Sequence, residues 1–137
     1  MKIIHSLLFL LAALLALPSA YAARNAPLVN YEEVQVATPD GKPTSAEHVR
    51  KAIIAAASRT RWAASAGPGN AVRLTYSRGG HTAVVDVAYS AKSYSIRYAD
   101  SSNLNYTQDG GKQLIHPTYN KQVNSLRLAI DVALRSN

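Results

Sequence analysis

A period of two in the side chains in the middle of the chain is the feature that most limits its possible folds. The alternation runs through three stretches, Val72–Ser77, Thr82–Tyr89 and Tyr94–Tyr98, separated by short turn-like segments. Successive side chains of a β-strand point to opposite faces, so a period of two predicts strands with one buried face. Short connections between them favour antiparallel hairpins. A fourth strand, Arg61–Ala66, is predicted before them, across the turn segment 67–70.

The composition of the turns predicts how these strands pair. A two-residue turn at Gly79-Gly80 places Arg78 opposite His81 and, counted inward, Arg73 opposite Asp86.

A second two-residue turn at Ala91-Lys92 places Asp86 opposite Arg97 as well. Both hairpins then bury the same set of side chains, and Asp86 lies between two arginines on the other face. If the loop between the strand Arg61–Ala66 and the next strand has an odd length, the side chain of Trp62 points toward the core beside Tyr76.

Helical periodicity flanks the strands on both sides. Thr44-Ser45-Ala46-Glu47 matches a capping box in which the Thr hydroxyl accepts a backbone hydrogen bond, and a helix over about 45–58 follows. A second helix begins at Pro117 or Thr118 and ends near Leu134, with apolar residues every three to four positions. This order predicts an α+β fold: helix, four-stranded antiparallel meander, helix, with both helices packed on one sheet face.

That single α+β domain is expected to span residues 44–137. An irregular N-terminal arm, 23–43, precedes it and is rich in Pro and Gly, with a short strand around Tyr31 to Val36.

The first 22 residues have the pattern of a secretory signal peptide. Lys2 precedes an apolar run from Ile3 to Leu17, and the small residues Ala20 and Ala22 lie three and one positions before a cut between Ala22 and Ala23. The run of about 15 residues is shorter than the ~20 that a spanning helix needs. An uncleaved N-terminal anchor helix is the alternative. We expect an exported protein, periplasmic or secreted, with no transmembrane anchor after processing.

Charge and cysteine content limit the chemistry. The chain has no cysteine, which excludes disulfides, thiolate metal sites, thiol catalysis and a lipid on an N-terminal Cys. The formal net charge is +7, and loss of Lys2 with the signal peptide leaves +6. A basic exported protein meets anionic surfaces easily, but no Lys/Arg block concentrates this charge. Solubility explains it equally well.

Four motifs along the chain resemble those of a protein family. They are RTRW, HTAVVDVAY, YSIRYADSSNLNY and IHPTYNKQVNSL, and they extend over about Ile53 to Ile130. In this order they resemble an uncharacterised family of small exported bacterial envelope proteins, many of them lipoproteins. This chain lacks the lipid-accepting cysteine and has Gln122 where similar sequences often carry Trp. The resemblance implies an exported α+β domain and no established activity.

Polar side chains gather where the last strand of the meander ends. Asp100 and Ser101 are typical of a turn that ends a strand, because their side chains bond nearby backbone N–H groups. Strand termination does not account for Asn103 and Tyr106, and a polar cluster beside an aromatic ring can bind a ligand. A calcium loop is not expected, since one alternate ligand position is apolar and the required glycine is missing.

A second candidate segment, 115–120, lies at the start of the last helix and carries His116, Tyr119 and Asn120. With the segment 100–106 and His81, it forms the predicted ligand-binding surface, because loops on a rigid scaffold usually carry function. The histidines of the mature chain have no recognised metal spacing. We therefore predict no metal site and no cofactor.

These features favour a small exported binding or interaction module of the bacterial cell envelope, monomeric or weakly oligomeric, whose partner is an unknown envelope protein or an anionic polymer. One alternative is a small periplasmic hydrolase that uses His81 or His116, although no G-x-S-x-G is present. The other is an electrostatic binder of anionic envelope polymer. Nucleic acid is not expected as a partner, because the tyrosines that could stack on bases fall on the face that the helices cover.

Overall fold

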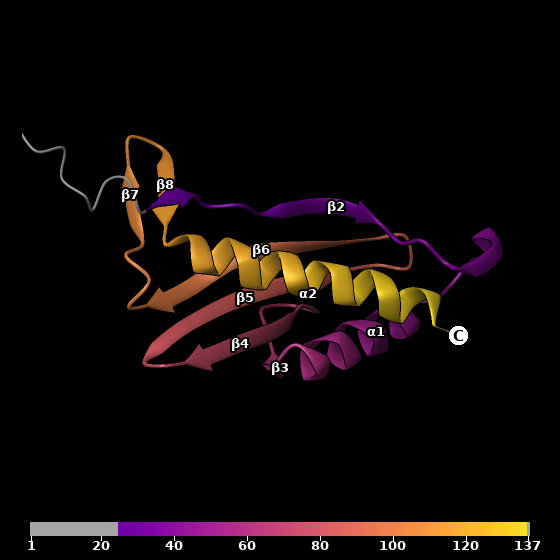
Figure 1. Ribbon diagram of the computed structural model, residues 1–137. Helices are drawn as coiled ribbons and strands as arrows, with labels where there is room; N and C mark the ends of the chain where they lie inside the picture. The colour runs from indigo at the N-terminus through magenta and orange to yellow at the C-terminus, as the bar shows by residue number, and fades with distance from the viewer. Residues whose placement is uncertain (1–24, 137) are drawn as a thin grey trace, which may run out of the picture.

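The structure, a computed structural model, describes residues 25–136 (Figure 1). The predicted signal peptide and its cleavage point between Ala22 and Ala23 lie outside these residues. Within them, helix α1 spans Ala46–Arg59 and helix α2 spans Pro117–Arg135, and a short 3-10 helix, η1, spans Pro39–Gly41. No helix in the described part is long and apolar enough to cross a membrane.

The larger of two antiparallel sheets has five strands in the order β2-β6-β5-β4-β3. Strands β3 to β6 follow one another along the chain, whereas β2 comes from the N-terminal arm and adds to the outer edge of β6. The bounds of the strands are β2 Tyr31–Gln35, β3 Trp62–Ala66, β4 Val72–Arg78, β5 His81–Tyr89 and β6 Ser93–Ser102.

The predicted fold, a single four-stranded meander between two helices, is wrong in its sheet organisation. The main sheet has a fifth strand, and a second sheet of three short strands, in the order β1-β8-β7, stands at one end of the molecule (Figure 1). Its strands are β1 Ala26–Pro27, β7 Thr107–Asp109 and β8 Lys112–Ile115. The arm, predicted to be irregular apart from a short strand around Tyr31 to Val36, therefore supplies one strand to each sheet.

The physical reason for this error lies in the pairing of β2. Its register shifts between Tyr31, which is opposite Ile96, and Val34, which is opposite Tyr94. Glu33 inside this irregularity has φ 48°. A bulge of this kind breaks the alternation by which a strand is recognised in a sequence, so the pattern does not reveal that β2 belongs to the main sheet.

The register predicted from the two hairpin turns is confirmed. Gly79-Gly80 and Ala91-Lys92 connect the strands, and both Arg73 and Arg97 lie opposite Asp86.

The ion pairs differ from this expectation, however. Arg73 donates from Nε and Nη2 to both carboxylate oxygens of Asp86, at 2.8 and 2.9 Å. Arg97 instead pairs with Glu32 of β2, at 2.7 Å. The acid that Arg97 binds comes from the strand whose position was not predicted.

Trp62 lies in the core, as its parity predicts. It is opposite Tyr76 and only 3% exposed, and the two ring centroids are 5.4 Å apart. The loop between β3 and β4 is Gly67–Ala71, which is longer than the turn segment expected but odd in length.

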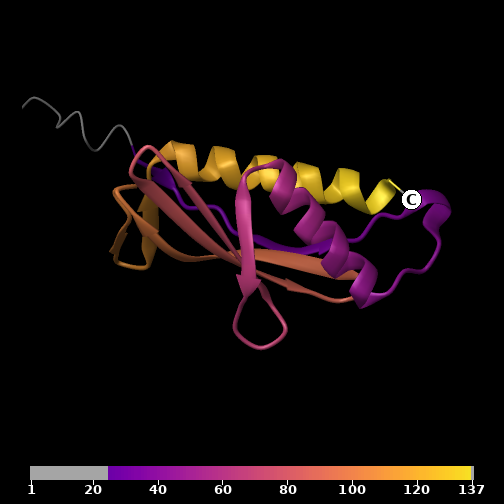
Figure 2. The same ribbon diagram turned by 90° about the horizontal axis from the view of Figure 1, so that it is seen from below.

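Both helices lie on one face of the five-stranded sheet (Figure 2). The buried face of α1 is rich in alanine, which allows close contact with β3 and α2. The buried side chains of α2 recur every three to four positions, as predicted: Tyr119, Val123, Leu126, Ile130 and Leu134. The core fills the space between this helical layer and the sheet.

The N-terminal cap of α1 differs from the predicted capping box, and a histidine caps α2. Ser45, not Thr44, caps α1, and its hydroxyl accepts from the backbone N–H of His48 at 3.1 Å. The Nδ1 atom of His116 caps α2 by accepting from the N–H of Thr118, and Pro117 occupies the first helical turn.

Candidate functional site

The polar segment after β6 is fastened to the β4–β5 turn through Asn103. Its Nδ2 donates to the carbonyl of Gly80 at 2.7 Å, and its own carbonyl accepts from Nδ1 of His81 at 2.7 Å. Asn103 and Asn105 both have left-handed backbones, with φ of 58° and 53°. Asn tolerates this conformation better than most residues, so the two asparagines determine the path of the loop.

Asp100 and Ser101 were expected to end the strand, but both lie within it. β6 passes a bulge at Ala99 and continues to Ser102, with Asp100 opposite Val84. The carboxylate of Asp100 accepts from the N–H of Ser101 at 2.8 Å, so its local backbone bond does form.

Tyr106 belongs to a cluster of stacked rings. It lies on Tyr98 with ring centroids 4.4 Å apart, and its hydroxyl accepts from Gln113 at 2.9 Å. Tyr98 in turn meets Tyr119 edge to face at 5.7 Å. The packing of the loop on the core therefore accounts for Tyr106.

His116 and Asn120 have structural partners. Besides capping α2, His116 donates its backbone N–H to the carbonyl of Leu104 at 2.8 Å. The Asn120 side chain donates to the carbonyl of Pro27 at 2.9 Å and accepts from the N–H of Val29 at 3.0 Å. Asn120 thus fastens the N-terminal arm to α2.

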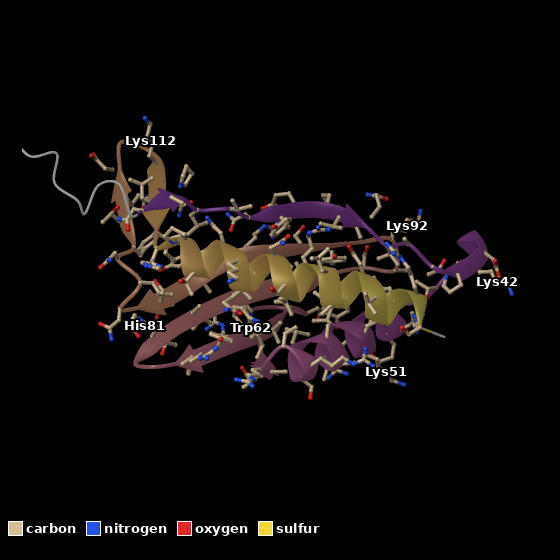
Figure 3. All side chains as sticks on the ribbon, in the orientation of Figure 1. Lys42, Lys51, Trp62, His81, Lys92 and Lys112 are labelled. Carbon is tan, nitrogen blue, oxygen red and sulfur yellow. The ribbon has the colours of Figure 1, made fainter. Side chains whose placement is uncertain are left out.

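A cavity of about 320 Å³ lies between the β4–β5 hairpin, Leu104 and the first turns of α2. We call it the hairpin pocket. Buried residues and exposed or half-exposed residues both line it. Its lining consists of the buried residues Tyr76, Ala83, Leu104 and Tyr119 and, nearer solvent, Arg78, Gly79, His81, Thr118 and Gln122. Figure 3 shows His81 at the end of the hairpin, at the opposite end of the molecule from Lys42.

The predicted site residues are divided between this pocket and its surroundings. His81 and Tyr119 line the hairpin pocket. A second, more open hollow lies beside it, and four of the predicted residues line it: Asp100, Ser101, Asn103 and Tyr106. His116 and Asn120 line neither. The predicted surface is thus one neighbourhood of the fold but not one site.

Several polar groups of the pocket lining lack partners within residues 25–136. The Arg78 side chain makes no ion pair or hydrogen bond there, and no carboxylate lines the pocket. A carbonyl only accepts, so the bond to Asn103 requires a proton on Nδ1 of His81 and leaves Nε2 free. The hydroxyl of Tyr119 is buried without a hydrogen bond. Burial first, and then the neighbouring Tyr98, raise the pKa of Tyr119, so its hydroxyl stays neutral.

Sequence reasoning missed Arg78, Leu104 and the pocket itself. The predicted register had placed Arg78 opposite His81, and this was the available signal for a basic pair at the hairpin end. Gln122, noticed only as a departure from similar sequences, lies on the pocket wall.

No protein-family model matches this chain. No curated protein and no solved structure matches it either. The family resemblance drawn from the motifs therefore remains a prediction. Among residues 25–136, no group of three or more His, Cys, Asp or Glu side chains could hold a metal ion.

Proposed function

We propose that this chain is a small exported binding module of the bacterial cell envelope and that its ligand occupies the hairpin pocket. The observation that carries the proposal is a preformed pocket with an apolar floor. At its rim lie two basic side chains, Arg78 and His81, and no acid lines the pocket to neutralise them.

The floor favours an apolar ligand group. Tyr76, Ala83, Leu104 and Tyr119 are each at most 8% exposed, so they form a fixed surface that belongs to the core. Ligand pockets are typically concave and mostly apolar, with a few polar groups that orient the ligand, and a volume near 320 Å³ suits a small group.

The rim favours an anion. Arg78 and His81 are neighbours across the β4–β5 hairpin, and no acid of the pocket lining neutralises them. The net charge of +6 that remains after loss of Lys2 with the signal peptide would also attract anionic ligands toward the molecule. The attraction of anions expected from the basic composition would thus be strongest at the rim of the hairpin pocket.

Anilinonaphthalene sulfonate, which is both apolar and anionic, provides a direct test by its fluorescence on binding. Gln122→Trp places a large ring on the pocket wall and should weaken binding about tenfold or more by filling the cavity. Gln108→Trp is the control, since Gln108 is exposed on β7 and does not line the pocket. Equal affinity of the wild type and both variants would refute the pocket as the site.

A second candidate function is hydrolysis with His81 as a base. The bond from its Nδ1 to a backbone carbonyl orients the ring and leaves Nε2 available, which is the arrangement a general base needs. A panel of ester, glycosidic and peptide substrates compares the wild type with His81→Ala and His116→Ala. Turnover that is lost in His81→Ala would favour this function over simple binding.

A further inference from the structure

We infer that the hairpin pocket binds a carboxylate attached to an apolar group. This chemistry is shared by the C-terminus of a peptide with an apolar last residue and by a free aromatic acid. The inference rests on the proposed function, because it names the ligand class of the same pocket.

Arg78 is the first reason to expect a carboxylate. Arg73 on the same strand and Arg97 on β6 each bind a carboxylate side chain on the open face of the sheet. Arg78 has no such partner within residues 25–136, although it lines a pocket. A guanidinium presents several N–H donors in a planar fork that fits a carboxylate with two parallel hydrogen bonds.

The other polar groups of the lining are compatible with the same ligand. Nε2 of His81 is the only ring nitrogen that remains for a ligand, and in the protonated ring it donates to an anion. Thr118 and Gln122 of α2 add a hydroxyl and an amide near the N-terminal end of that helix, where the helix dipole favours negative charge.

The size of the pocket restricts what can carry the carboxylate. A volume of about 320 Å³ lies near the lower limit for ligand pockets, so a ring or one large side chain fits and an extended polymer does not. The ligand must therefore be a small molecule or the end of a chain.

Ligand binding in the pocket can be followed by the fluorescence of a nearby tryptophan. Trp62 is the one tryptophan of the chain, and its ring lies 5.4 Å from Tyr76, which belongs to the pocket floor. A ligand that contacts Tyr76 is expected to alter the emission of Trp62, so unlabelled protein suffices for titration.

The experiment titrates the protein with two matched pairs of probes, 3-phenylpropionate against 3-phenylpropionamide, and acetyl-Gly-Gly-Phe with a free carboxylate against its C-terminal amide. We expect each carboxylate to bind about tenfold more tightly than its amide, since a charge-assisted hydrogen bond contributes about 1.5–3 kcal/mol. Calorimetry gives the same affinities independently of fluorescence.

Arg78→Gln should abolish this preference for the carboxylate. Arg73→Gln is the control on the same strand, because Arg73 lies on the opposite face and pairs with Asp86. Circular dichroism establishes that both variants are folded. Tighter binding of the peptide acid indicates a protein C-terminus as the source, and tighter binding of phenylpropionate indicates a free acid; both support the shared chemistry.

Three results would overturn the inference: amides that bind as tightly as acids, a carboxylate preference that survives in Arg78→Gln, or no binding of any probe at millimolar concentration. If these occur while Gln122→Trp still weakens binding of anilinonaphthalene sulfonate, the pocket remains a binding site and only its ligand class is wrong. If the sulfonate is also unaffected, the proposed function itself fails.

Discussion

At the scale of single residues, Asn103 shows how one side chain can connect two segments. Its backbone has a left-handed conformation, its side-chain amide donates to the carbonyl of Gly80, and its backbone carbonyl accepts from Nδ1 of His81. The first two roles suit Asn, whereas the third uses a backbone carbonyl that any residue would supply. Asn103, predicted from the sequence as a ligand contact, thus positions His81, which we propose as another.

Asn103→Gly and Asn103→Ala separate two of these roles. Glycine adopts the left-handed backbone freely, so Asn103→Gly loses only the side-chain bond to Gly80, about 0.5–1.5 kcal/mol of unfolding free energy. Asn103→Ala also incurs the backbone cost of about 1–2 kcal/mol. We therefore expect Ala to be the more destabilising substitution in urea unfolding. Equal losses would mean that the backbone conformation is not what selects Asn.

The residue scale also shows what the sequence could and could not predict of the site. His81 and Tyr119 were recognised because one begins a strand and the other lies near a helix start. Arg78 was placed opposite His81 by the turn, but its lack of a partner is a property of the folded surface. Leu104, in the middle of a polar segment, gave no signal at all.

At the scale of elements, β2 is an edge strand and pairs with β6 alone in the main sheet. The Glu32–Arg97 pair on its exposed side comprises three hydrogen bonds between 2.7 and 3.1 Å. The guanidinium of Arg127 lies over the ring of Tyr31 in the same strand, 5.3 Å from the ring centroid, and the Tyr31 hydroxyl donates to the side chain of Asn124. These polar contacts add to the packing of Tyr31 and Val34 against the core in holding this bulged strand.

Acid should weaken this attachment. The hydrogen bond from Arg97 holds the pKa of Glu32 below its ordinary value of 4.5. A lowered carboxyl pKa contributes stability above the unfolded value, and the contribution is lost as the pH falls through the folded one. The difference in urea midpoint between wild type and Glu32→Gln should therefore shrink from pH 7 to pH 3.

The effect of Glu32→Gln should be small, because the Glu32 side chain is 52% exposed and solvent screens the pair. Glu47→Gln serves as the control, since Glu47 lies on α1 and its ion pair is with Arg50 of the same helix, not with β2. A midpoint difference that stays constant with pH would show that the pair does not stabilise the edge.

Elements with a regular local pattern were predicted well, and the others were not. β4, β5, β6 and both helices follow periods of two or 3.6 over many residues. β1, β7 and β8 have two to four residues each, too few for any period to be visible. β1 also finds its only partner, β8, far along the chain, and local patterns cannot indicate such a pairing.

At the scale of the whole molecule, the N-terminal arm ties the two sheets to α2. β1 joins the small sheet, β2 joins the large one, and Asn120 binds the backbone between them at Pro27 and Val29. Export would therefore have to preserve the arm from Asn25 onward. Cleavage between Ala22 and Ala23 does so.

N-terminal sequencing of protein from the cell envelope fraction should accordingly give Ala23 as the first residue. The reason is the spacing of small residues at Ala20 and Ala22 after an apolar run. A protein that retains Met1 in that fraction would contradict cleavage and favour the uncleaved anchor helix.

The distance along the chain between the arm and its partners also orders the assembly of the molecule. Glu32 and Arg97 are 65 residues apart, and Pro27 and Asn120 are 93 apart, whereas β3 to β6 are joined by short loops. Closing a long loop costs more entropy than closing a short one, so the hairpins should form first and the arm should dock last. Until it docks, the outer edge of β6 is an unpaired strand edge. Such edges pair with other chains, so the protein is exposed to self-association through β6 until the N-terminal arm docks, and the docked arm then removes that risk.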